Sequence, residues 1–94
     1  MVRIWQLVFE SDVKKQFSKL PKDVQMRILD YFDDRVLVIP DPLILATQLV
    51  GEMSGLWRFR VGDYRIICNI DKGKLIITAL AVGHRREIYK KTRH

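Results

Sequence analysis

The chain has few of the residues that hold a fold together covalently or through a metal. Among its 94 residues are one cysteine, Cys68, and two histidines, His84 and His94. A single cysteine excludes an internal disulfide, and two histidines are too few to complete a zinc site of the Cys-x-x-Cys kind. We therefore expect no metal and no cofactor. The low cysteine content is typical of a reducing compartment.

Long apolar runs are also missing. No stretch approaches the length needed to cross a bilayer, and the first ten residues are too short and too interrupted by polar side chains for a signal peptide. The sequence has no internal repeat, low-complexity tract or linker, and its length leaves no room for a second core. We expect one soluble, cytoplasmic domain over residues 1–94, with no membrane partner.

Negative charge is scarce in one part of the chain only. Residues 1–50 carry seven Lys or Arg and seven Asp or Glu, whereas residues 51–94 carry ten and four, so the whole formal charge of +6 lies in the second part. A surface kept basic for solubility would more often intersperse both signs. The asymmetry therefore favours a polyanionic partner, such as a nucleic acid, over a merely solvated face.

The first forty residues predict a strand followed by two helices. Residues 2–9 alternate loosely and are rich in β-branched and aromatic side chains. Ser11 is a candidate N-cap for the first helix, Pro21 ends that helix and can begin the next, and the second helix stops by Ile39 at the latest. The apolar stripes are Val13, Phe17 and Leu20 on the first helix, and Val24, Ile28, Tyr31 and Phe32 on the second.

Three strands are predicted for the second half of the chain. Residues 56–61 and 64–70 alternate on either side of a two-residue, glycine-first turn, and residues 74–82 form a long apolar strand. The segment 40–54 is mixed and predicts no single element. This order predicts an α+β domain with an N-terminal strand, a two-helix hairpin and a three-stranded antiparallel meander, the helices packing on one face of the sheet.

The two-residue turn fixes the register of the first hairpin. Arg60 then lies opposite Arg65, and like charges in that position are destabilising. Phosphates would separate them, because guanidinium groups bind phosphate oxygens bidentately. The predicted core face is Trp57, Phe59, Val61, Tyr64, Ile66 and Cys68, and the predicted basic face is Arg58, Arg60 and Arg65, with Ile67 beside them. On the core face, Cys68 is a buried small hydrophobe, and the aromatic residues favour packing over base stacking.

The segment 83–91 adds a second group of cations. Its sequence, Gly-His-Arg-Arg-Glu-Ile-Tyr-Lys-Lys, surrounds Tyr89 with positive charge, which would favour the phenolate and lower the tyrosine pKa from about 10. Alternatively, Ile88 and Tyr89 simply anchor the tail to the sheet. His84 is a candidate general acid or base, although a lone histidine after a glycine is more often a turn residue.

These motifs resemble a known family. The hairpin Leu-Trp-Arg-Phe-Arg-Val-Gly-Asp-Tyr-Arg at 56–65 and the run Val-Gly-His-Arg-Arg-Glu-Ile-Tyr at 82–89 are similar to the RelE/ParE superfamily of toxins from toxin–antitoxin pairs. The order of elements and the chain length match that superfamily too. Its RelE branch implies a metal-free, ribosome-dependent endoribonuclease that cuts mRNA in the ribosomal A site. There the nucleotide's own 2′-hydroxyl attacks the adjacent phosphate, leaving a cyclic phosphate and a 5′-hydroxyl.

The resemblance also implies catalytic roles for five residues. The family's basic pair matches Arg58 and Arg60, its Tyr-Arg arginine matches Arg65, its Gly-x-Arg arginine matches Arg85, and its terminal tyrosine matches Tyr89. The arginines would stabilise the charge that develops on the phosphorane. Because arginine is a poor general acid or base, the tyrosine is the candidate for moving a proton.

Two departures from the family pattern leave points open. The family often has lysine where this chain has an arginine pair, and its segment after the third meander strand is longer in some members. Arg86 could therefore take the role assigned to Arg85. Otherwise Arg86, Lys90 and Lys91 are the expected RNA-binding residues.

The resemblance leaves other functions and one partner to consider. The ParE branch shares the fold but acts on DNA gyrase, and a third possibility is a non-catalytic RNA-binding module. A cluster of four arginines and a tyrosine is what an RNA-cleaving site uses and a gyrase-binding surface does not need. A toxin also implies a RelB-like, acidic-tailed antitoxin that covers the basic surface and the tail at 90–94. Leu43, Leu45 and Leu49 are candidates for lining a groove that takes an amphipathic segment of this partner.

Overall fold

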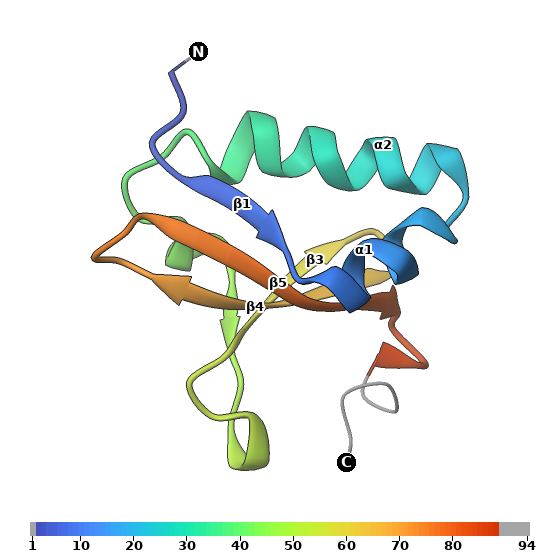
Figure 1. Ribbon diagram of the computed structural model, residues 1–94. Helices are drawn as coiled ribbons and strands as arrows, with labels where there is room; N and C mark the ends of the chain where they lie inside the picture. Colours follow the sequence, from blue (N-terminus) through green and yellow to red (C-terminus); the bar gives the residue numbers. More distant parts are fainter. Residues whose placement is uncertain (1, 89–94) are drawn as a thin grey trace.

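A five-stranded mixed sheet carries two helices on one face in the computed structural model, which describes residues 2–88 (Figure 1). The strand order is β1-β5-β4-β3-β2, with β1 parallel to β5 and every other pair antiparallel. The predicted α+β architecture is confirmed. The elements are β1 (Gln6–Phe9), α1 (Ser11–Ser18), α2 (Lys22–Tyr31), β2 (Thr47–Gln48), β3 (Trp57–Val61), β4 (Tyr64–Asp71) and β5 (Ile76–His84).

The N-terminal strand is shorter than its sequence pattern predicts. It begins at Gln6 because the two residues before it bond elsewhere: the backbone N–H groups of Ile4 and Trp5 both donate to the Leu37 carbonyl, at 2.7 and 3.0 Å. The Trp5 side chain is buried, and its indole N–H donates to the Pro40 carbonyl at 3.2 Å. The start of the chain is therefore held by the segment that follows α2, and not by β5.

The helices pack as their apolar stripes predict, with one error at the first cap. The N-cap of α1 is Glu10, whose side chain makes no capping bond, and Ser11 is the first helical residue. The helix starts one residue early because β1 runs straight into it, with the Glu10 N–H still bonded to the Ala79 carbonyl at 3.2 Å. After α2 the chain continues as a π-helical turn, Phe32–Val36, and so leaves the helix before Ile39.

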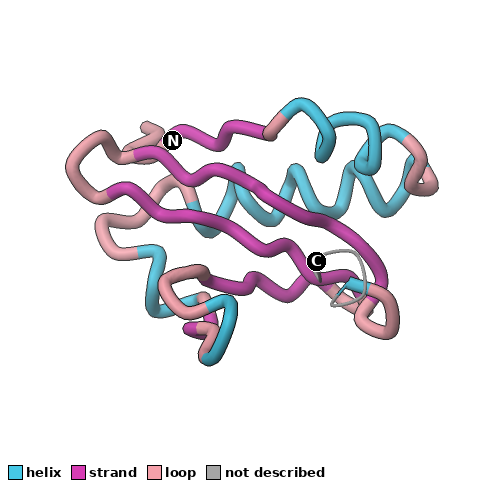
Figure 2. The backbone as a smooth tube through the Cα atoms, turned by 60° about the horizontal axis from the view of Figure 1, so that its bottom comes forward, coloured by secondary structure: helices cyan, strands magenta, loops and turns pink. Residues whose placement is uncertain are grey.

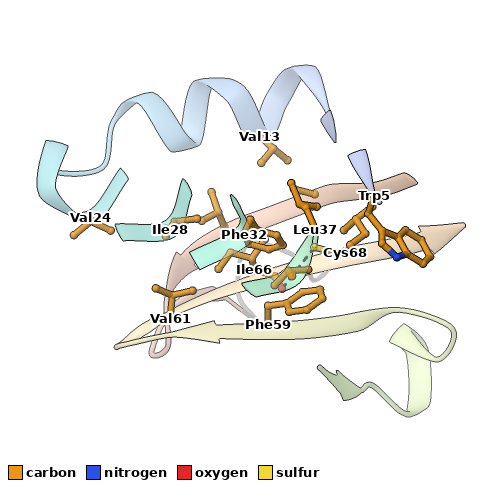
Figure 3. Packing of buried hydrophobic residues seen from close by; sticks show 14 residues of the cluster. Trp5, Val13, Val24, Ile28, Phe32, Leu37, Phe59, Val61, Ile66 and Cys68 are labelled. Atoms are coloured by element: carbon orange, nitrogen blue, oxygen red, sulfur yellow. Dashed lines mark hydrogen bonds between the residues drawn. The ribbon is translucent and has the colours of Figure 1, made fainter. Parts of the chain in front are cut away.

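The main core lies between the helices and the sheet (Figure 3). Val24 and Ile28 of α2 are buried over the hairpin, and the rings of Phe32 and Phe59 meet edge to face at 5.1 Å. Cys68 is fully buried in this layer, and burial raises the pKa of its thiol. It is a packing residue, as predicted. Trp57 and Tyr64 lie on the same face but are only half-buried.

The segment that predicted no element contains a strand and two short 3-10 turns. Strand β2 adds a fifth strand at the edge of the sheet, between the turns Pro42–Leu45 and Gly51–Met53. The chain then returns under the face that the helices leave bare, where a small second cluster forms from Leu49, Ile67, Ala81 and Ile88, with Met53 and Leu56 packed against it. Leu49 is buried in this cluster, so the prediction that it lines a groove for an antitoxin is wrong.

Candidate functional site

The register of the β3–β4 hairpin places the predicted arginines on the bare face of the sheet. Arg60 lies opposite Arg65, and Arg58 lies opposite Ile67, as the two-residue turn requires. On the next strand Gly83 lies opposite Arg65, so one row across three strands reads Arg60, Arg65, Gly83. Figure 2 turns this side toward the viewer, and neither α1 nor α2 covers the strands there. Arg60 is exposed, whereas Arg58 and Arg65 are half-buried.

The turn of the hairpin, Gly62-Asp63, anchors Arg65. Its Nη1 atom donates to the Gly62 carbonyl at 2.9 Å and to the Tyr64 carbonyl at 3.0 Å. Gly62 has a φ of +59°, as the first residue of a glycine-first turn must. The turn therefore both reverses the chain and fixes a guanidinium group at the tip of the hairpin.

Arg85 meets the same turn from a segment twenty residues further along the chain. Its backbone N–H donates to the Asp63 carbonyl at 2.8 Å, and its Nε atom lies 3.8 Å from the Asp63 carboxylate. Both side chains are more than half exposed, so the ion pair is weak and the backbone bond fixes the position. The structure thus joins Arg85 to the hairpin. It also gives Asp63 a cationic partner that the hairpin sequence alone did not supply.

His84 faces away from the arginines. It is the last residue of β5, which runs two residues beyond its predicted end, and it pairs with Tyr64 on the helix-covered face. The two rings meet edge to face at 5.7 Å, and the Nδ1 atom of His84 accepts the N–H of Arg86 at 3.2 Å. His84 therefore ends a strand on the face opposite Arg60 and Arg65, and its candidate role as a general acid or base stays a prediction.

Of the remaining candidates, Arg86 is exposed just beyond β5. Ile88 is fully buried in the second cluster and so ties the segment that directly follows β5 to the bare face. Tyr89, Lys90 and Lys91 lie outside the described residues.

One arginine near the turn was missed in the sequence. Arg27 of α2 lies outside the apolar stripe of that helix, and its Nη1 atom lies 3.5 Å from the position that a Cβ atom on Gly62 would occupy. Its place on the exposed side of a helix was predictable. Its contact with the hairpin was not, because that depends on how the helix crosses the sheet.

Neither a metal cluster nor a membrane span is found within residues 2–88. No three side chains of His, Cys, Asp or Glu there come together in a way that could hold a metal ion. No helix in this range is long and apolar enough to cross a bilayer.

Comparison with known proteins places this geometry in a family. Residues 4–89 match the family described as the ParE toxin of type II toxin–antitoxin systems. Toxin RelG of Mycobacterium tuberculosis is 27% identical over 84 residues, which are 88% of this chain and 93% of that protein.

Solved structures agree. The RelBE2 toxin–antitoxin complex of M. tuberculosis matches with a TM-score of 0.78 and 24% identity, over 89% of this chain and 100% of that one. The archaeal RelE–RelB complex of Pyrococcus horikoshii matches with a TM-score of 0.66 and 27% identity, over 87% and 96%. The chain therefore belongs to the ParE toxin family of type II toxin–antitoxin systems, as a RelE-like toxin.

Proposed function

We propose that this toxin, as a single domain over residues 1–94, is a ribosome-dependent endoribonuclease that cuts mRNA without a metal ion and so inhibits translation. The observation that carries the proposal is the set of arginines on one face. Arg60 and Arg65 lie directly opposite each other, Arg58 is on the same face, and Arg85 is bonded to the same turn as Arg65. Packing does not require cations on adjacent strands, whereas a phosphate group between them would offset their repulsion.

The arginines suit the charge changes of phosphoryl transfer. When a 2′-hydroxyl attacks the adjacent phosphorus, negative charge builds on the equatorial oxygens of the phosphorane. Groups already held in place stabilise that charge without reorganising. Arg65 is the best suited, because its guanidinium group donates to the Gly62 carbonyl. Arg85 is next, because its backbone N–H is bonded to the Asp63 carbonyl. Losing one such contact typically slows catalysis on the order of a hundredfold.

The proton must be moved by another group. The 2′-oxygen loses a proton as its bond to phosphorus forms, and the departing 5′-oxygen gains one from water as its bond to phosphorus breaks. Arginine stays protonated at any physiological pH and cannot accept the first proton. In this proposal Tyr89, with its pKa lowered by neighbouring cations, accepts it. Arg86, whose side chain is exposed, would bind the flanking RNA together with Lys90 and Lys91.

Cleavage of mRNA on programmed ribosomes tests the assignment. Arg65→Ala and Tyr89→Phe should each slow the cutting on the order of a hundredfold. Arg35→Ala, an exposed arginine at the end of the π-helical turn and away from the hairpin, should cut like the wild type. If both site variants cut at the wild-type rate, the catalytic assignment is wrong.

The name of the matching family supports one alternative, which is inhibition of DNA gyrase by binding. Expression in cells separates the two functions if mRNA 5′ ends are mapped beside a gyrase supercoiling assay. In-frame cuts within translated codons would support the ribonuclease. Gyrase inhibition without such cuts would support the alternative.

The partner in this proposal is a RelB-like antitoxin. The two structurally similar complexes named above each pair a toxin with an antitoxin, and a net charge of +6 suits an acidic binding segment. A pull-down with the product of a small adjacent open reading frame tests this. Failure of that product to bind would count against it.

A further inference from the structure

The tip of the β3–β4 hairpin is contacted by guanidinium groups from both sides of the sheet. On the bare face, Arg65 donates to the Gly62 carbonyl at 2.9 Å. On the helix-covered side, the Nη1 atom of Arg27 lies 3.5 Å from the Cβ position of Gly62. Because both groups reach one residue, standard backbone dimensions put them no more than about 10 Å apart. The basic surface therefore continues around the tip.

The conformation of Gly62 suits glycine because its φ is +59°. Its carbonyl accepts the bond from Arg65, and the Nη1 atom of Arg27 lies at an ordinary van der Waals distance of 3.5 Å from its Cβ position. The same turn residue therefore lies beside both cations.

The local charge around Arg27 leaves it available to a ligand. Within residues 2–88 it forms an ion pair with the carboxylate of Asp23, one helical turn earlier, at 3.9 Å. The two side chains are 61% and 75% exposed, and such an exposed pair contributes little and is readily exchanged for another anion. Asp63 lies in the turn itself, and its carboxylate is directed to Arg85 at 3.8 Å.

We propose that Arg27 and the hairpin tip form a second phosphate-binding position for single-stranded RNA, on the helix-covered side of the sheet. This inference rests on the proposed ribonuclease function. The RNA strand whose scissile phosphate lies among the arginines of the bare face passes over Gly62, and a neighbouring phosphate contacts Arg27. The partly exposed rings of Tyr64 and His84 lie on that same side. Tyr64 directly follows the turn, and His84 lies opposite it on β5.

Binding of an uncleavable RNA tests the position. The probe is a fluorescent single-stranded oligonucleotide with 2′-O-methyl groups throughout, titrated with the full-length toxin at several salt concentrations. Loss of one phosphate contact should reduce the slope of log affinity against log salt by about 0.7, which is about fivefold in affinity at 0.1 M salt. We expect this change for Arg27→Gln. The same substitution at Arg35, exposed about 12 Å further along the helical segment, should change neither quantity.

Several results would overturn the inference. Arg27→Gln binding with wild-type affinity and salt slope would do so, as would an equal loss in Arg35→Gln, which would report net charge alone. Weakened binding of a duplex DNA probe with unchanged RNA binding would assign the surface to DNA instead. Cleavage on programmed ribosomes is measured in parallel. A wild-type protein that does not cleave counts against the proposed function, while the comparison on the uncleavable probe remains decisive for Arg27.

Discussion

The two faces of the sheet are built on different principles. The helix-covered face buries a large apolar layer, and within residues 2–88 no polar or charged residue is fully buried. The bare face has a small cluster around Ile67 and Ile88, and beside it a row of arginines. The helix-covered face therefore stabilises the domain, while the like charges that lie together on the bare face lower its stability. Substitutions on the two faces should separate stability from activity.

The largest loss of stability is expected on the helix-covered face. Phe59 is fully buried against Phe32, and Phe59→Ala leaves a cavity that neighbouring side chains cannot fill. The free energy of unfolding should fall by about 3–5 kcal/mol, measured by urea denaturation. A loss below about 1 kcal/mol would mean that this layer does not dominate the stability.

The small cluster on the bare face should matter less. Ile67→Ala removes a buried side chain, but the cluster around it is smaller and closer to solvent. The expected loss is about 2–3 kcal/mol in the same urea experiment, at the lower end for a large-to-small core substitution. A loss greater than that of Phe59→Ala would reverse the comparison between the faces.

The hairpin turn should contribute less to stability than either apolar cluster. Gly62→Ala places a side chain on a residue with a φ of +59°, which costs about 1–2 kcal/mol for a non-glycine residue. Thermal unfolding followed by circular dichroism would detect it. Gly73→Ala, in the next turn along the chain, is the control, because its φ is not in the left-handed region. Equal effects of the two substitutions would show that the backbone conformation of Gly62 is not what matters.

The smallest change in stability carries the opposite sign. Arg60→Ala removes one of two like charges that lie directly opposite each other, so the free energy of unfolding should rise by a few tenths of a kcal/mol at low salt. Cleavage of mRNA by the same variant should fall on the order of a hundredfold if the proposed function holds. A variant that is both less stable and fully active would contradict the division between the faces.

Much of the fold was predictable because local rules agreed with one another. The glycine-first turn at 62–63 leaves a single register for the hairpin, and the alternation on either side of it places Phe59 and Ile66 on the core side. The apolar stripe of α2 was predictable for the same reason, since Val24 and Ile28 recur at helical spacing.

The rest depended on contacts between distant residues. Strand β2 is two residues long and exists because Thr47 and Gln48 pair with β3, which no pattern within 40–54 indicates. In the site, the shared face of the hairpin arginines could be predicted from the hairpin register. The bond from Arg85 to Asp63 and the approach of Arg27 to Gly62 could not, because they depend on the path of other elements. The proton-moving role of Tyr89 stays a prediction.

The parallel pairing of β1 with β5 has a consequence for how the toxin is made. It joins Gln6 to Ile76, at opposite ends of the chain, and contacts of such high sequence separation form slowly. During synthesis the helices and the basic hairpin leave the ribosome before β5, which lies between β1 and β4 in the sheet. The segment bearing Arg85 follows that strand, so a nascent chain cannot assemble the arginine cluster before β5 has been made.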